Sequence, residues 1–109
     1  MKKLVLVTMF LVSGLMAGVT SITKIKDMYV YDNFIVIKMQ NKHTNSNGCT
    51  SSSARDYLYV PTNTTGGNRM YSAILSAYVA QKKVRLGYSG CAQWGSSTIP
   101  KVYGFSMLK

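Results

Sequence analysis

Few side chains in this 109-residue chain could perform catalysis. His43 is the only histidine and lies in a polar loop, and the serine run 51–53 has no other candidate base. One histidine and two cysteines cannot supply the four ligands of a zinc site. The only acidic residues, Asp27, Asp32 and Asp56, lie far apart in the sequence and do not suggest a glycosidase pair. We therefore expect no enzyme, no metal site and no cofactor.

The two cysteines, Cys49 and Cys91, are expected to pair. In an oxidising compartment they most simply form one disulfide. It would close a loop of about forty residues and stabilise the fold by about 3–4 kcal/mol on the chain-entropy model. Cys49 follows an Asn-Gly turn and Cys91 ends a predicted strand, so a short cross-link can form between them.

Trp94 is the first candidate for ligand binding. This single tryptophan stands in a predicted loop, 92–97, beside Gln93, Ser96 and Ser97. A sugar can lay its C–H face on the indole ring while amide and hydroxyl groups bind its hydroxyls. The alternative is that Trp94 packs against the disulfide or closes the mouth of a barrel.

Tyrosines provide a second candidate surface. Tyr57 and Tyr59 occupy alternate positions of the predicted strand 56–62, so they share one face. Tyr29 and Tyr31 have the same spacing in an earlier strand. The four could form a binding face, but half-buried packing is the commoner role of alternate tyrosines.

One amphipathic helix is predicted, and the other segments are arranged around it. Asn68 is a favourable N-cap residue, and Lys82 and Lys83 complement the helix dipole at the other end. The length is about three to four turns, typical of a helix packed on a β-structure. Its apolar stripe consists of Met70, Tyr71, Ile74, Leu75 and Tyr78.

The rest of the chain is predicted to form strands and turns. Five strands are expected, at 19–32, 34–39, 56–62, 83–90 and 98–109. The first contains a bulge near Lys26 and Asp27, and Asp32 and Asn33 turn the chain into the second. A long polar loop, 41–55, is tethered by the disulfide. The inward residues of the last strand are expected to be Ile99, Val102, Phe105 and Met107.

The order β-β-β-α-β-β is that of the OB-fold, a five-stranded, partly open Greek-key barrel. The alternative is a two-layer α+β sheet with the helix on one face. We expect residues 19–109 to form one mostly β domain with one helix, arranged as an OB-like barrel.

Residues 1–18 have the features of a signal peptide. Lys2 and Lys3 precede an apolar run, and small residues follow as far as Gly18. The run is too short to cross a bilayer, which takes about twenty residues. A secreted or periplasmic bacterial protein is expected.

Removal of residues 1–18 leaves eleven basic and three acidic residues, a formal charge of +8. On an exported protein this charge favours anionic surfaces, such as lipid phosphates and sialylated or sulfated glycans, over chromosomal nucleic acid. The alternative is a solvated basic surface that only keeps the protein soluble.

The order of several short motifs resembles one family. The motifs are a strand ending in Lys38-Met39, a polar loop into Gly48-Cys49, the strand Tyr57-Leu-Tyr-Val and the helix start Met70-Tyr-Ser-Ala-Ile-Leu. They are similar to the binding subunit of subtilase cytotoxin and related small exported bacterial proteins. This resemblance implies an OB-type barrel, a ring of five subunits that binds sialylated glycans, and a catalytic A subunit as partner. The loops depart from the toxin's pattern, so no sugar-contacting residue is carried over.

We expect an exported, non-enzymatic binding module that recognises glycans on a host or envelope surface. One alternative is an OB-fold binder of oligonucleotides or other polyanions, with Tyr57 and Tyr59 stacking on bases in a cationic groove. Another is an inhibitor or structural subunit whose ligand is a protein.

The free face of the predicted helix suggests a homo-oligomer, which would be a pentamer if the toxin-like assembly applies. No charged residue lies between Arg69 and Lys82, and small side chains permit close approach. The positive charge opposes association unless the basic residues point away from the interface. The face consists of Ser72, Ala73, Ser76, Ala77, Ala80 and Gln81.

Overall fold

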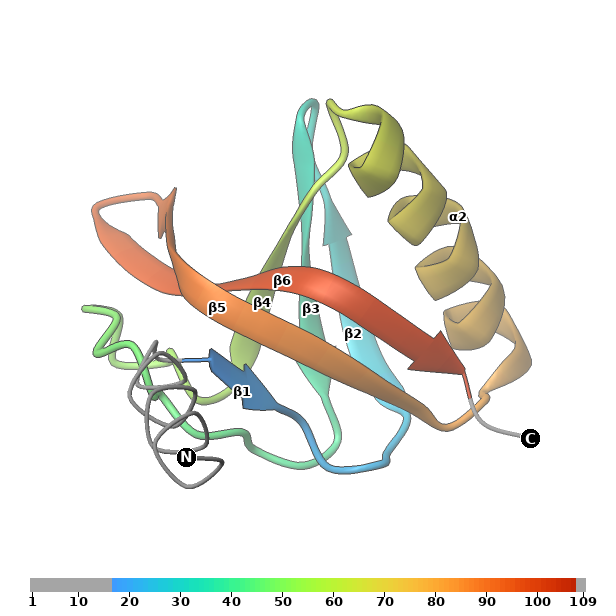
Figure 1. The fold of residues 1–109 in the computed structure, drawn as a ribbon, viewed down its shortest axis with the longest axis horizontal. Coiled ribbons are helices and arrows are strands. Elements are labelled where there is room, and N and C mark those ends of the chain that lie inside the picture. The colour runs from blue at the N-terminus through green and yellow to red at the C-terminus, as the bar shows by residue number, and fades with distance from the viewer. Residues whose placement is uncertain (1–16, 108–109) are drawn as a thin grey trace, which may run out of the picture.

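In the computed structural model, residues 17–107 are described and form six strands and one helix (Figure 1). The elements are β1 (Ala17–Val19), β2 (Ile25–Val30), β3 (Phe34–Met39), β4 (Tyr57–Pro61), α2 (Thr65–Ala80), β5 (Val84–Trp94) and β6 (Ser97–Met107). This part of the chain is therefore mostly β with one helix, as predicted. The predicted signal peptide lies outside the described residues, except for Ala17 and Gly18, which belong to β1.

The six strands form one sheet in the order β1-β5-β6-β4-β3-β2. Neighbouring strands are antiparallel except β4 and β6, which pair in parallel at Tyr59 and Lys101. Figure 1 shows the long β5–β6 pair crossing the β2–β3–β4 group. The two edge strands, β1 and β2, do not pair with each other, so the sheet is not closed into a barrel.

The first predicted strand, 19–32, is divided into two strands. β1 pairs with β5, whereas β2 pairs with β3. Between them Thr23 forms a bridge with Val84 of β5, with N–H···O distances of 3.1 and 2.8 Å. The register of β2 against β3 shifts between Ile25 and Asp27, which confirms the predicted bulge.

The β5–β6 hairpin is longer than predicted, and the predicted loop 92–97 is wrong. β5 continues to Trp94, and only Gly95 and Ser96 turn the chain. The apparent strand end near Gly90 is a bulge, because Gly90 has φ +74° at a shift in register. Gly95, with φ +68°, supplies the left-handed conformation that a two-residue hairpin turn needs.

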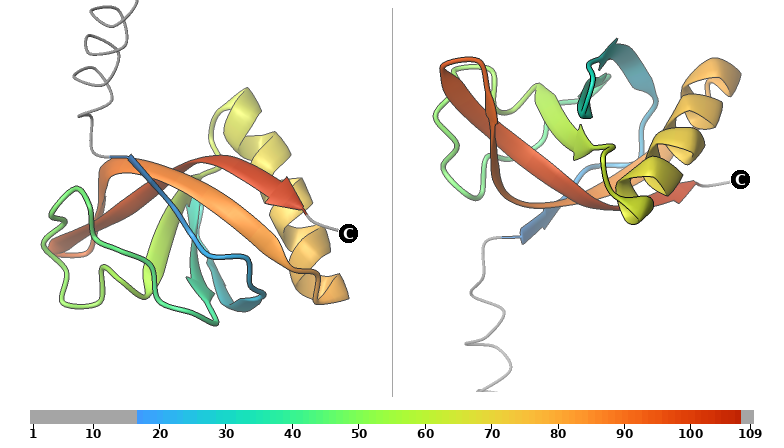
Figure 2. Two further views of the ribbon diagram at one scale, coloured as in Figure 1. Left: turned by 60° about the horizontal axis from the view of Figure 1, so that its bottom comes forward. Right: turned by 90° about the horizontal axis from the view of Figure 1, so that it is seen from above.

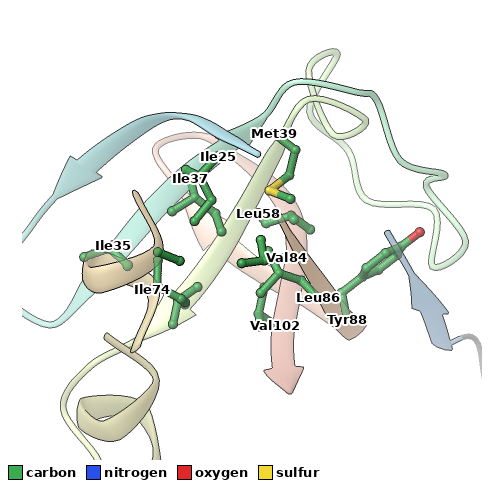
Figure 3. Close-up of a cluster of buried hydrophobic side chains, with 12 residues drawn as sticks. Ile25, Ile35, Ile37, Met39, Leu58, Ile74, Val84, Leu86, Tyr88 and Val102 are labelled. Carbon is green, nitrogen blue, oxygen red and sulfur yellow. The ribbon is translucent and has the colours of Figure 1, made fainter. Parts of the chain in front are cut away.

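Apolar side chains of both strand groups meet in one core (Figure 3). From β6, Ile99 and Val102 are buried, as predicted. Phe105 packs partly buried against the core, and the side chain of Met107 lies outside the described part. The buried cluster consists of Ile25, Ile35, Ile37, Met39, Leu58, Val60, Ile74, Ala77, Val84, Leu86, Tyr88 and Val102.

α2 begins earlier than predicted. Thr64, not Asn68, is the N-cap, and its hydroxyl oxygen accepts a hydrogen bond of 2.9 Å from the backbone N–H of Gly67. Gly67 lies against the backbone carbonyl of Pro61, so the first turn packs on the end of β4. Consecutive glycines have low helix propensity and therefore hide this turn in the sequence. Gln81 ends the helix in the left-handed conformation.

The residues that α2 buries against the sheet differ from the predicted apolar stripe of the helix. Ala77, predicted on the free face, is buried, and Leu75, predicted in the stripe, is 38% exposed. The close contact between Gly67 and Pro61 turns the helix so that Gly67, Ile74 and Ala77 face the sheet. Other predicted members of the stripe pack partly buried against the core: Met70, Tyr71 and Tyr78.

The long loop 41–55 is fastened to the β5–β6 hairpin. The predicted disulfide joins Cys49 to Cys91, whose Cα atoms are 5.7 Å apart. Beside it, the backbone N–H of Thr50 donates to the hydroxyl of Thr98 at 2.8 Å, and the N–H of Thr98 donates to the hydroxyl of Thr50 at 2.9 Å. The loop is therefore part of the packed structure.

His43 is buried, although it lies in this polar loop. Its Nε2 lies 2.7 Å from the carbonyl oxygen of Ala54, and its ring packs 5.2 Å from that of Tyr88. Nδ1 is buried and has no hydrogen-bond partner among the described residues. Burial lowers the pKa of His43, and the Ala54 carbonyl and the Asp56 carboxylate oppose this effect only in part. The folded protein therefore holds His43 neutral.

Gly66 and Gly67 give a matched test of how α2 is placed. Gly66→Ala should raise the free energy of unfolding by up to about 1 kcal/mol, because the new methyl group meets no atom and Ala favours a helix. Gly67→Ala should lower it by about 1–3 kcal/mol, because the methyl group would collide with the backbone of Pro61. Chemical denaturation measures both, and equal effects would contradict the contact.

The burial of His43 predicts a pH-dependent stability. Below about pH 6.5, the ordinary pKa of histidine, the unfolded chain binds a proton that the folded protein excludes. The free energy of unfolding should therefore fall as the pH is lowered from about 7 to about 5. Because the chain has one histidine, this slope should largely disappear in His43→Gln, whose amide can still donate to Ala54. Urea denaturation at several pH values measures the slope, and an unchanged slope in the variant would refute the assignment.

Candidate functional site

Six aromatic side chains on the outer side of the sheet form two groups of three contacting rings, and we call the six together the aromatic face. Its members are Tyr29, Tyr31, Phe34, Tyr57, Tyr59 and Trp94. Tyr31, Phe34 and Tyr59 form a stack with centroid distances of 4.7 and 4.6 Å and interplanar angles of 21° and 16°. Stacked rings cover one another's faces, so this part offers solvent mainly ring edges and phenol hydroxyls.

The Trp94 end of the aromatic face has a different geometry. The rings of Trp94 and Tyr57 lie 5.1 Å apart and are inclined by 53°, and Tyr29 meets Tyr57 edge-on at 6.1 Å. Lys38 places its Nζ 5.6 Å from the centre of the Tyr57 ring, a cation–π distance. Among the described residues no ring lies parallel to Trp94, so this end can stack on a flat ligand.

The side chains of the aromatic face have a solvent exposure between that of core residues and that of fully exposed residues. Tyr29 and Tyr31 are 42% and 43% exposed, and the other members are half-buried. In register, Val36 lies opposite both Tyr29 and Tyr59, and it is fully buried beneath the rings. The rings therefore stabilise the sheet and also present aromatic surface to solvent.

Basic residues border the aromatic face. Lys38 lies opposite Tyr57 in the register of β3 and β4, and the exposed Lys101 lies beside Tyr59. The neighbouring Tyr57 phenol raises the pKa of Tyr29 above its ordinary value, because two phenolates would repel each other. Tyr29 therefore remains a neutral hydroxyl, and the charge of this surface comes chiefly from lysine.

Of the candidate ligand residues, the structure places the tryptophan and all four tyrosines in the aromatic face. Trp94, Tyr57 and Tyr59 belong to the aromatic face. Gln93 precedes Trp94 on β5 and so points to the other side of the strand, where its amide donates to the carbonyl of the turn glycine at 3.1 Å. Ser96 is exposed in the turn next to Trp94.

Sequence reasoning does not single out Phe34 or Lys38 as site residues. The apolar run of β3 indicates a buried strand, and it hides the outward positions. The sequence signal that could have identified Phe34 is the predicted turn at Asp32 and Asn33. In the structure the N–H of Tyr31 donates a hydrogen bond of 2.9 Å to the carbonyl of Phe34 across this turn. Cross-strand neighbours of a hairpin contact each other, so this turn brings the two rings together.

The described residues show no catalytic or metal-binding cluster. Within 17–107, no three His, Cys, Asp or Glu side chains are grouped to hold a metal ion. Cys49 and Cys91 are joined, His43 contacts a backbone carbonyl, and Asp56 pairs with Lys42 at 3.4 Å. None of the helical structure in this range is long and apolar enough to cross a membrane.

No protein-family model, curated protein or solved structure matches this chain. The resemblance to the subtilase cytotoxin binding subunit therefore stays an expectation drawn from the sequence motifs. The function has to be inferred from the aromatic face, the charge and the strand arrangement.

Proposed function

We propose that this chain is an exported, non-enzymatic binding module that recognises glycans through its aromatic face. The observation that carries the proposal is the group of three contacting rings, Tyr29, Tyr57 and Trp94, in which Tyr29 is exposed to solvent and the Trp94 ring is inclined to that of Tyr57. Sugars bind proteins by stacking their C–H faces on such rings and by hydrogen bonds to hydroxyl and amide groups.

The sugar ring would lie at the Trp94 end. There the indole has no parallel neighbour among the described residues, whereas the rings of Tyr31, Phe34 and Tyr59 cover one another. Lys38 lies over the adjacent Tyr57 and can bind an acidic group of the ligand. This arrangement favours anionic glycans, such as sialylated or sulfated ones, in agreement with the basic composition.

The strand arrangement supports an OB-type barrel as part of this proposal. β1 and β2 can be treated as one bent strand. That strand is linked to β5 by the bridge between Thr23 and Val84 and by the hydrogen bond of 2.9 Å from the Thr20 N–H to the Leu86 carbonyl. The helix then lies between the third and fourth strands, as in the OB-fold. OB-folds bind oligosaccharides and oligonucleotides on their second and third strands and on two adjacent loops. Those strands correspond to β3 and β4, and the loops to the turns beside Tyr31 and Trp94.

A second candidate function is the binding of single-stranded nucleic acid or another polyanion. The specific observation in its favour is that Lys38 and Lys101 flank Tyr57 and Tyr59, so cations and stacking surfaces occur together. Binding of this kind weakens steeply with added salt. A protein ligand, as for an inhibitor or structural subunit, remains the third candidate.

Replacement of the tryptophan tests the glycan proposal. Trp94→Ala should weaken binding to any glycan captured by the oxidised, secreted protein by about two- to ten-fold, since an aromatic contact contributes about 0.5–1.5 kcal/mol. Tyr103→Ala, an exposed aromatic residue outside the aromatic face, is the matched control and should leave binding unchanged. A glycan array followed by titration calorimetry measures both.

The array has outcomes that would refute the proposal. Absence of any glycan ligand, or equal binding by Trp94→Ala and the native protein, would reject sugar recognition at this site. Capture of single-stranded DNA with an affinity that falls steeply between low and high salt would favour the polyanion binder instead.

We also propose that the protein forms a homo-oligomer through α2, as a ring of five with a catalytic partner if the toxin resemblance extends to assembly. Val79 is 74% exposed and lies one turn from the exposed Leu75, and the helix carries no charge beyond Arg69 until Lys82. An uncharged helix surface with exposed apolar residues is suited to close packing against another subunit.

Val79→Lys tests this assembly. The native protein should have a mass of several chains in light scattering, and Val79→Lys should shift it toward one chain, because a lysine in an apolar interface is poorly solvated. Val30→Lys changes another exposed valine, 59% exposed on β2, and should leave the mass unchanged. A native mass of one chain at every concentration would end the proposal.

A further inference from the structure

A groove of about 380 Å³ lies on β1, β5 and β6, and it shares no residue with the aromatic face. Figure 2 shows these three strands side by side at one side of the molecule. The walls and floor of the groove include Val19, Arg85, Gly87, Tyr103, Gly104 and Ser106. None of these residues is used by the proposed glycan site.

A pair of glycines lies at the groove, and the Gly104 member forms its open floor. Gly87 and Gly104 lie opposite each other in the register of β5 and β6, so two adjacent strands carry no side chain at this point. A Cβ atom on Gly104 would meet no atom within 4 Å, which shows that the space above it is open. A ligand can therefore approach the backbone closely here.

Tyr103 forms one wall because of a bulge. The register of β6 moves from Gly104 opposite Gly87 to Val102 opposite Tyr88, which leaves Tyr103 as the extra residue. Its ring lies over Gly87, where an added Cβ would be 2.9 Å from the ring carbon Cζ, yet the residue is 61% exposed. Bulges commonly redirect a side chain toward a functional site. On the β1 side, Val19 adds an exposed apolar group.

Arg85 supplies a charged donor at the end of the glycine floor. It lies two residues from Gly87, and hence on the same face of β5, directly opposite Ser106 of β6. Arg85 is exposed and forms no ion pair or side-chain hydrogen bond with the described residues, whose one salt bridge joins Lys42 to Asp56. A guanidinium group binds two oxygens of a carboxylate or phosphate at once.

We propose that this groove binds a small organic oxyanion. The carboxylate or phosphate oxygens bind Arg85 and the hydroxyl of Ser106. The flat apolar part of the ligand lies over Gly104, against the ring of Tyr103, which covers Gly87. This second ligand site is independent of the aromatic face, and its failure would leave the glycan proposal intact.

The test uses benzoate and phenyl phosphate as probes, titrated into the isotope-labelled, oxidised protein and observed by amide NMR shifts. Saturable shifts are expected at Gly87, Gly104 and Ser106. Gly104→Val should abolish them without loss of thermal stability, because the valine fills open space and suits a strand. Arg85→Gln should weaken binding about ten-fold or more, since a hydrogen bond to a charged group contributes about 1.5–3 kcal/mol.

Lys26→Gln removes an exposed positive charge from β2, at the opposite edge of the sheet from β1, and is the matched control, so it should bind the probes normally. Saturation by phenyl phosphate alone would identify a phosphate ester as the ligand, and saturation by benzoate alone a carboxylate. Unchanged shifts in both Gly104→Val and Arg85→Gln would overturn the proposal. Shifts spread over all the lysines, with no saturation at Gly104, would overturn it as well, because they indicate nonspecific charge attraction.

Discussion

The parallel pairing of β4 with β6 is the constraint on which the rest of the structure depends. The β2–β3–β4 group and the β1–β5–β6 group are each antiparallel, and the contact at Tyr59 and Lys101 joins them. Strands that pair in parallel cannot be joined by a tight turn, so the chain must travel before β6 returns beside β4. The sixteen residues of α2 and the length of β5 provide that path. The contact of Gly67 with Pro61 fixes the start of the path on the end of β4.

This connection also determines where the exposed surfaces lie. β5 and β6 cross the other strands and extend well beyond them (Figure 1), so the tip of the hairpin carries Trp94 to the ring of Tyr57. The disulfide and the paired hydrogen bonds between Thr50 and Thr98 hold the same region against the long loop. The aromatic face is thus assembled from three segments, the β2–β3 hairpin, β4 and the end of β5, and the cross-links lie near the last of them.

The two proposed sites lie on one curved sheet, and one is built from large side chains whereas the other is built from their absence. At the aromatic face, large rings cover a buried valine and still offer their outer edges to solvent. At the groove, Gly104 leaves the backbone open, and Gly87 makes room for the ring of Tyr103. Both lie beside basic groups, Lys38 in one case and Arg85 in the other, in a chain with thirteen basic and three acidic residues. Anionic ligands are therefore favoured at either surface.

The sequence by itself determined the local features of the protein. Alternation in β4, the bulge in β2, the existence of one helix and the pairing of the two cysteines were all predictable, because each depends on neighbouring residues or on composition. Tertiary structure decided the rest. The bulge at Gly90 and the turn at Gly95 form because β5 pairs with β6. Trp94 therefore lies on a strand and not in a loop. The contact at Pro61 set the rotation of α2, and burial of His43 depended on Tyr88, which lies far away in sequence. Contacts of this kind join distant segments, and no local pattern encodes them.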